Sequence, residues 1–205
     1  MANSASTRGS DVITPVATLC YSHLSAVDEN SKYRAELVFS PEDLVGAEAD
    51  LMDSLVQASK DLVAQAWPGK TKGKKTGIIT GDQTSTDDEL HNSAAGIIRP
   101  WSKPRNGECS IKFKHLGDRE TGRMRLMPHE DVASTFYDGC KVRAVACPFT
   151  FSVDGNSGVS WFLNQIIFIA DGTRIGGAGA SDMDERLAKI CGVDLDEEGS
   201  VESLL

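Results

Sequence analysis

Long hydrophobic runs are missing from this sequence of 205 residues. The longest apolar stretch, residues 166–170, is about five residues long, whereas a helix that spans a membrane needs about 20. The first ten residues lack the apolar core of a secretory signal and read as a short flexible arm. We therefore expect a soluble protein that stays in the cytoplasm and does not contact a membrane.

Spacings typical of metal and redox sites are also missing. The five cysteines form no Cys-x-x-Cys pair, and the four histidines show no His-Glu-x-x-His motif. An odd number of cysteines without such spacing is typical of reduced thiols, which fits the cytoplasm. We predict no metal site and no other cofactor.

Motifs for nucleotide binding and catalysis are incomplete. A P-loop needs four residues between its glycines, but Gly69 and Gly73 enclose only three, and Lys74 is followed by another lysine. Residues 177–179 lack the third glycine of a dinucleotide-binding motif. No spacing brings together two carboxylates or a Ser-His-Asp set. The sequence therefore favours a binding protein over an enzyme.

Positive and negative charges are separated along the chain. The formal net charge is −9, yet residues 67–126 contain twelve Lys and Arg against seven Asp and Glu, a net charge of +5. Residues 181–205 carry eight acids against two bases, and residues 192–205 have the charge and lack of periodicity of a disordered acidic tail. The basic middle segment is the part suited to nucleic-acid phosphates.

The alternation of apolar and polar residues predicts a domain rich in β-strands. Residues 12–24 and 33–40 have the β-branched content and alternation of two strands. Residues 139–153 and 158–170 form the strongest pair, and the turn-rich residues 154–157 predict that they make a hairpin.

One long helix is predicted after the second strand. Ser40 has the position of an N-cap, Pro41 that of the first helical residue, and Asp43 places an acid in the first turn. The helix would run from residue 41 to about Ala66. Its apolar residues recur at spacings of three, four or seven, which makes one stripe that packs on a sheet.

The first hairpin strand carries cations beside aromatic side chains. Lys141 and Arg143 share one face of this strand, and simple alternation would add Phe149 and Phe151 to it. Pro148 is placed to introduce a bulge that reverses this alternation further along.

Other cations flank the middle of the chain. Residues 69–76 form a basic, glycine-rich surface loop, and a strand at 109–115 would turn Lys112 and Lys114 away from its apolar face. Trp101 lies between several cations in sequence, which is unusual for a core residue.

Cations that follow phosphates, with aromatic rings that stack on bases, bind single-stranded nucleic acid without reading its sequence. The candidate DNA-binding residues are Lys70, Lys72, Lys74, Lys75, Arg99, Trp101, Lys103, Lys112, Lys114, Arg123, Arg125, Lys141, Arg143, Phe151 and Trp161. In the alternative interpretation each lysine is an ordinary solvated side chain and the aromatic rings belong to the core.

The second half of the chain resembles a known family. Residues 136–144 (Phe-Tyr-Asp-Gly-Cys-Lys-Val-Arg-Ala), Phe-Thr-Phe at 149–151, 158–165 (Gly-Val-Ser-Trp-Phe-Leu-Asn-Gln) and 171–177 (Asp-Gly-Thr-Arg-Ile-Gly-Gly) follow one another as in the phage single-stranded DNA-binding proteins with an OB-fold. The resemblance is clearest over about residues 136–184.

Two departures from the family pattern accompany this resemblance. Asn164 and Gln165 stand where the family tends to have two asparagines, and the chain ends in Ser-Leu-Leu where several such phage proteins end in an aromatic residue. The first departure does not change the expected fold. Because of the second, the resemblance does not identify a specific partner for the tail.

The resemblance implies a mainly β protein with an OB-fold, a five-stranded Greek-key barrel, with one long packed helix and loop insertions. It implies a flexible arm at 1–11, an OB-fold domain at 12–191 and a disordered acidic tail at 192–205. The implied function is sequence-independent binding that coats and protects single-stranded DNA during phage DNA replication or recombination, without catalysis, in the cytoplasm of the infected bacterium.

The tail is expected to compete with DNA for the groove and to recruit replication proteins such as a DNA polymerase or a helicase. Its candidate partner-binding residues are Asp194, Asp196, Glu197, Glu198 and Glu202. The alternative function is that of an acidic phage interaction or structural protein without nucleic-acid binding, and a nucleotide-dependent enzyme ranks third.

Overall fold

The computed structural model describes residues 6–84, 88–116, 124–153 and 155–175. The chain divides into a compact unit that ends at Thr173 and a second unit that begins at Arg174, and the fold below is that of the first. The predicted boundary at 191/192 and the acidic tail lie outside the described residues. None of the helices in the described ranges is long and apolar enough to cross a membrane.

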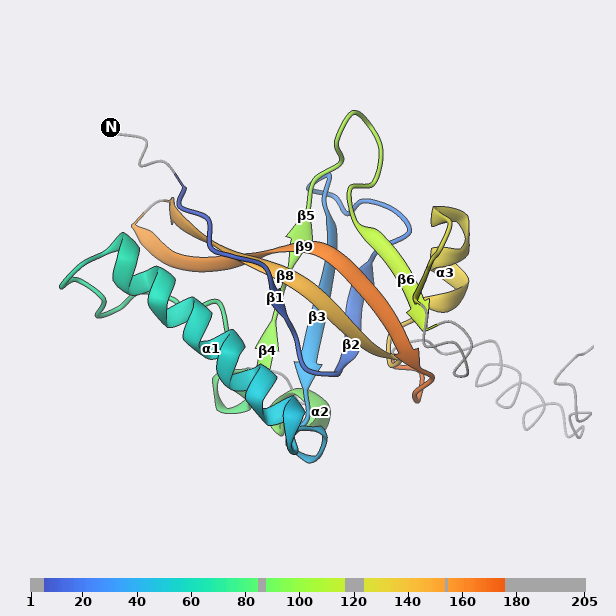
Figure 1. Cartoon of the computed structure of the whole chain (residues 1–205), viewed down its shortest axis with the longest axis horizontal. Helices are drawn as coiled ribbons and strands as arrows, with labels where there is room; N and C mark the ends of the chain where they lie inside the picture. The colour runs from blue at the N-terminus through green and yellow to red at the C-terminus, as the bar shows by residue number, and fades with distance from the viewer. Residues whose placement is uncertain (1–5, 85–87, 117–123, 154, 176–205) are drawn as a thin grey trace, which may run out of the picture. The chain divides into compact units, whose positions relative to one another are not determined.

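Strands make up most of the regular structure (Figure 1). The strands are β1 Val12–Ile13, β2 Ala17–His23, β3 Tyr33–Phe39, β4 Gly96–Ile98, β5 Trp101–Ser102, β6 Lys112–Leu116, β7 Met124–Leu126, β8 Lys141–Val153 and β9 Asn156–Ala170. The helices are α1 Ala47–Ala66, α2 Glu89–Asn92 and α3 Val132–Thr135, with 3-10 turns η1 Pro41–Asp43, η2 Gly81–Gln83 and η3 His129–Asp131.

Five of these strands close on themselves. β8 pairs with β2, β2 with β3, β3 with β5, β5 with β9, and β9 again with β8. Only the β5–β9 pair in this ring is parallel. A ring of five pairings, of which β2–β3 and β8–β9 join consecutive strands and the other three do not, is the kind of arrangement found in an OB-fold. The structure thus confirms a mainly β, OB-like fold with one long helix, to which β1, β4, β6 and β7 are added.

The core lies inside this ring and under α1. Leu19, Leu37 and Phe39 from β2 and β3 are completely buried, because the alternation of these strands turns them inward. Val142 and Ile166 of the predicted hairpin, which exists as β8 and β9, join the same cluster. Helix α1 packs on β1, β8 and β9 through its apolar stripe.

The long helix ends at Ala66 as predicted but begins later than predicted. Ser40 makes no side-chain cap, and Pro41 starts only the short turn η1. Gly46 then has a φ of 56°, a backbone conformation that costs glycine little, and α1 begins at Ala47. The capping signal therefore marks a turn, and the glycine redirects the chain into the helix.

The alternation along β8 changes before the predicted position. The β8–β9 register shifts between Lys141 and Val142 and again between Val145 and Ala146, whereas Pro148 pairs regularly with β9. The residues from Ala146 to Thr150 are all buried as a result of this shift and of the chain that covers them.

The covering chain is the N-terminal segment, residues 6–11, which we expected to be part of a flexible arm. The backbone N–H of Thr150 donates to the carbonyl oxygen of Thr7 at 2.8 Å, and that of Gly9 donates to the carbonyl of Pro148 at 2.8 Å. The expectation of a flexible arm is wrong for these residues, because they add to the edge of β8.

The four described cysteines are free, as predicted. Burial raises the pKa of Cys20 to about 12, with nearby acids such as Glu36 adding to the effect. Burial also raises the pKa of Cys140 to about 11. Both thiols are therefore protonated and unreactive at neutral pH.

Candidate nucleic-acid interface

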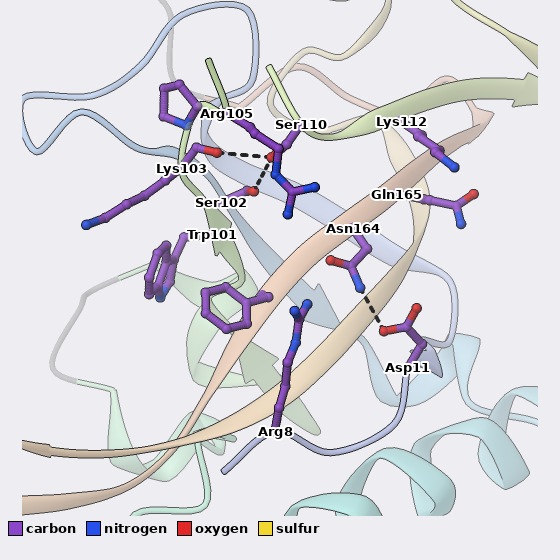
Figure 2. Close-up of a pocket in the computed structure, with 12 residues that line it drawn as sticks. Arg8, Asp11, Trp101, Ser102, Lys103, Arg105, Ser110, Lys112, Asn164 and Gln165 are labelled. Carbon is purple, nitrogen blue, oxygen red and sulfur yellow. Dashed lines mark hydrogen bonds between the residues drawn. The ribbon is translucent and has the colours of Figure 1, made fainter. Parts of the chain in front are cut away.

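A hollow of about 700 Å³ opens where β5, β6, β9 and the N-terminal segment meet (Figure 2). We call it the first hollow. Its lining residues are Arg8, Asp11, Trp101, Ser102, Lys103, Pro104, Arg105, Ser110, Lys112, Phe162, Asn164 and Gln165. Four Lys and Arg side chains and one acid among them make this a predominantly positive surface.

 The four cations are Arg8, Lys103, Arg105 and Lys112, and the acid is Asp11.

Aromatic rings form one side of the first hollow. The rings of Phe149 and Phe162 stack with centroids 3.9 Å apart, and Trp101 meets Phe162 edge-on at 4.9 Å. The indole N–H of Trp101 donates to Ser160 Oγ at 3.3 Å, which fixes the ring at the surface. Lys32 Nζ lies over this ring, 4.4 Å from its centroid. A half-buried indole under a movable lysine is a surface on which a base can stack once the lysine turns aside.

Two further hollows continue the first across the sheet. The second, of about 460 Å³, shares Trp101 with the first and is also lined by Lys32, Glu36 and Arg99. The third, of about 670 Å³, shares Arg99 with the second and reaches the basic loop at Lys74 and Lys75. Because neighbouring hollows share lining residues, we treat the three together as one groove and use that name below.

Arg99 is held in the groove by a buried network of charged side chains. The Nε of Arg99 donates to Glu36 Oε2, and the other oxygen of Glu36 lies 2.5 Å from His91 Nε2. His91 Nδ1 lies 2.6 Å from Asp88 Oδ2. A neutral imidazole has one N–H and donates to one carboxylate, so donation to both requires the imidazolium. The side chain of Glu36 is 6% exposed and that of Arg99 61%, so a buried acid positions an exposed cation.

Many of the predicted candidates do lie in the groove. Trp101, Lys103 and Lys112 line the first hollow, and Arg99 lines the second and third. The third hollow also contains four other candidates, which are Lys74, Lys75, Phe151 and Trp161.

Other candidates lie outside the three hollows. Lys70 and Lys72 are exposed on the loop that leads to the third hollow. Lys114 is half-buried on β6, and Arg125 is exposed on the neighbouring β7. Arg123 lies outside the described residues.

Lys141 and Arg143, which were predicted to line the phosphate path, line none of the three hollows. Lys141 Nζ lies 2.7 Å from Asp43 Oδ2, and Arg143 forms an ion pair with Glu48. Helix α1 and the turn before it cover this face of β8, so both cations serve to attach the helix to the sheet.

The prediction that Trp161 is a stacking surface is wrong. Its side chain is 1% exposed, and its indole N–H donates to the carbonyl oxygen of Gly77 at 3.0 Å. The sequence does indicate which aromatic residue of β9 faces outward. Val159, Trp161 and Leu163 alternate along one apolar face of the strand, which leaves Phe162 on the opposite face.

Several groove residues are absent from the predicted set. Phe162 follows from the alternation just described, and Arg105 from its closeness to Trp101 in sequence. Lys32 ends the loop before β3, where an OB-fold places a binding loop. Arg8 carries no such signal, because its place depends on how the N-terminal segment returns to β8.

An OB-like ring with cations and an accessible tryptophan along one groove defines a protein of the single-stranded nucleic-acid-binding class. A family profile described as "Enterobacter phage Enc34, ssDNA-binding protein" matches residues 11–190. The chain belongs to this family of phage single-stranded DNA-binding proteins, whose function is binding and not catalysis. The resemblance found in the sequence is thereby confirmed.

Solved structures show the same fold. The single-stranded DNA-binding protein of bacteriophage Enc34 in complex with ssDNA is similar with a TM-score of 0.62 and 16% identity, over 80% of this chain and 88% of that chain. A structure described as the single-stranded DNA-binding protein from bacteriophage Enc34 gives 0.56 and 17%, over 85% and 88%. The gp2.5 single-stranded DNA-binding protein of bacteriophage T7 gives 0.51 and 12%, over 95% and 99%. No curated protein sequence matches.

Proposed function

We propose that this chain binds single-stranded DNA along the groove without regard to sequence, and that it coats and protects the strand during phage DNA replication or recombination. The observation that carries this proposal is the placement of Trp101 in the groove between cations on either side. It would act on DNA in the cytoplasm of the infected bacterium.

Each part of the groove has a separate task in this proposal. The cations neutralise phosphates, and the release of counterions that follows supplies most of the binding energy. Trp101 stacks on a base when Lys32 moves from its ring to a phosphate. Neither contact distinguishes one base from another, so binding is independent of sequence.

The proposed contacts leave out three predicted residues, Lys141, Arg143 and Trp161. They add Lys32, Arg105 and Phe162. The groove residues proposed to contact DNA are Lys32, Lys74, Lys75, Arg99, Trp101, Lys103, Arg105, Lys112, Phe151 and Phe162. Lys70, Lys72, Lys114 and Arg125 are proposed to contact the strand only beyond the groove, and Arg123, which lies outside the described residues, stays a predicted contact.

The salt dependence of binding tests this proposal. With about four neutralised phosphates, the log-log slope of affinity for oligo(dT) against salt is expected near −3. Arg105→Gln with Lys112→Gln removes two phosphate contacts and is expected to bring the slope about 1.4 closer to zero. Fluorescence anisotropy at several salt concentrations measures both values.

The matched control is Lys141→Gln with Arg143→Gln, which removes the same charge from β8 under α1. This variant is expected to melt at a lower temperature and to keep the slope of the unaltered chain, because its cations pair with Asp43 and Glu48. A slope near zero for the unaltered chain would contradict the groove proposal and favour an interaction protein that does not bind nucleic acid.

We further propose that an OB-fold domain at 12–191 is followed by an acidic tail at 192–205 that competes with DNA and recruits replication proteins, such as a DNA polymerase or a helicase. Deleting residues 192–205 removes five acids and changes the formal net charge from −9 to −4. Because a tethered segment acts at an effective concentration of order millimolar, the shortened chain is expected to bind oligo(dT) several-fold more tightly at low salt.

The gain in affinity is expected to vanish near 1 M salt, where the Debye length falls to about 3 Å. Titrations of both chains at low and high salt measure it. Equal affinities at low salt would show that the tail does not compete with DNA, and partner recruitment would then be its only proposed role.

A further inference from the structure

The N-terminal segment is built onto the sheet at the edge of the groove. The backbone N–H of Thr7 donates to Thr150 Oγ1 at 2.8 Å, and the thiol of Cys147 donates to the carbonyl oxygen of Gly9 at 3.2 Å. A Cβ on Gly9 would lie 2.9 Å from Cγ of Pro148, so this close approach requires glycine. The segment is therefore fitted to β8 at one particular register, which fixes the position of Arg8.

The side chain of Arg8 extends from this segment into the first hollow (Figure 2). Its Nε donates to Cys147 Sγ at 3.3 Å, and its Cζ lies over the ring of Phe162, 4.9 Å from the centroid. Within the described part of the chain no carboxylate forms an ion pair with Arg8, and Asp11 instead accepts a hydrogen bond from Asn164 at 2.7 Å. The guanidinium is thus held by a thiol and a ring, with its terminal nitrogens left for a ligand.

Arg105 reaches the same hollow from the opposite side. It lies on the connection between β5 and β6, and in Figure 2 its guanidinium and that of Arg8 point toward one another. Neither Arg8 nor Arg105 has an ion-pair partner among the described residues, and Lys112 lines the same hollow. Like charges that converge in this way repel one another unless an anion lies between them.

A backbone phosphate of single-stranded DNA is the anion that fits this arrangement. Guanidinium groups bind phosphate through paired N–H donors, and two of them on opposite sides can satisfy its oxygens. The aromatic cluster of Trp101 and Phe162 lies along the same hollow, where the base attached to that phosphate can stack.

We propose that Arg8 and Arg105 hold one backbone phosphate between them, so that the N-terminal segment forms one wall of the DNA-binding groove. This inference rests on the proposed function, since it assigns a subsite of the same groove. DNA binding would then also tighten the attachment of the segment to β8.

Arg8→Gln tests this assignment directly. It is expected to weaken oligo(dT) binding roughly tenfold at low salt, because a charge-assisted contact is lost, and to bring the salt slope closer to zero by less than about 0.7, because Arg105 still pairs with the shared phosphate. Arg8→Lys is expected to keep the slope, since the charge remains. The control Lys60→Gln removes an equal charge from the exposed side of α1 and is expected to change neither value.

Two further measurements separate a shared phosphate from a merely structural role. If both arginines hold one phosphate, Arg8→Gln with Arg105→Gln is expected to lose less affinity than the product of the single losses. Hydrogen exchange at the amides of Gly9 and Thr150, both bonded across the segment, is expected to slow when oligo(dT) is added.

The possible results are distinguishable. If Arg8→Gln binds as tightly as the unaltered chain while Arg105→Gln binds more weakly, the role of Arg8 is overturned and DNA binding in the groove stands. Fully multiplicative losses would overturn the shared phosphate. Failure of the unaltered chain to bind oligo(dT) would overturn the proposed function itself, and this subsite with it.

Discussion

Replacing Trp101 with alanine is expected to weaken the binding of oligo(dT) by about ten- to a hundredfold, because stacking of a base on an aromatic ring is worth about 1–3 kcal/mol. Trp101 joins the first and second hollows, so a strand that follows the groove passes over it. The ring is held by Ser160 and by its edge-on contact with Phe162, which means that little order has to be gained on binding. Anisotropy titrations at constant salt measure the loss.

Trp101→Phe is the matched variant, since it keeps an aromatic surface and is expected to recover most of the affinity. Fluorescence gives a second readout. Oligo(dT) is expected to quench the emission of the unaltered chain and to quench that of Trp101→Phe much less, because the ring of Trp161 is buried and Trp67 lines none of the three hollows. Full affinity in Trp101→Ala would show that the indole is a structural residue and that the strand takes another route.

Local patterns predicted β2, β3, β8 and β9 because each of these patterns has a local cause, whereas the short strands β4 and β5 were not predicted. The alternation of Tyr33, Leu37 and Phe39 marks a face of β3 that is buried, and the turn residues between β8 and β9 favour a hairpin. The start of α1 was less predictable. Ser40 and Pro41 mark only the turn η1, in which Ser40 makes no side-chain cap, and the direction of the helix depends on packing against β8, which no local pattern contains.

The groove was only partly predictable for the same reason. Trp101 is marked by neighbouring cations in the sequence, and the structure places Lys103 and Lys112 beside it. The cations of Lys141 and Arg143 meet acids that precede them by 98 and 95 positions, so their pairing is visible only in the fold.

The position of Arg8 in the N-terminal segment also depends on a contact between residues that are far apart in sequence. Arg8 and Cys147 are 139 positions apart in sequence, and only the return of the segment to β8 joins them. Residues whose role depends on such distant contacts can be assigned by the structure and not by spacing.

His91→Leu is expected to lower the free energy of unfolding by about 3 kcal/mol and the melting temperature by about 10 °C, because it leaves one oxygen of a buried carboxylate without its hydrogen-bond partner. Glu36 is only 6% exposed, and one of its oxygens has His91 as its partner while the other has Arg99. Removing the imidazole leaves Glu36 Oε1 against an apolar side chain, and the cost is that of a buried carboxylate oxygen without a hydrogen-bond partner, while Oε2 keeps its ion pair with Arg99. Thermal unfolding followed by circular dichroism measures it.

The control for this prediction is His23→Leu, whose ring has an exposed contact with Arg34, and which is expected to change stability by less than about 0.5 kcal/mol. Glu36→Leu combined with His91→Leu is expected to cost less than the sum of the two single changes, because a buried pair replaced as a whole leaves no charge behind. The double variant is also expected to bind oligo(dT) more weakly than the unaltered chain, since Arg99 loses the acid that holds it in the groove. If the two single losses simply add, Glu36 and His91 stabilise the fold independently, and the network does not act as one unit beneath the groove.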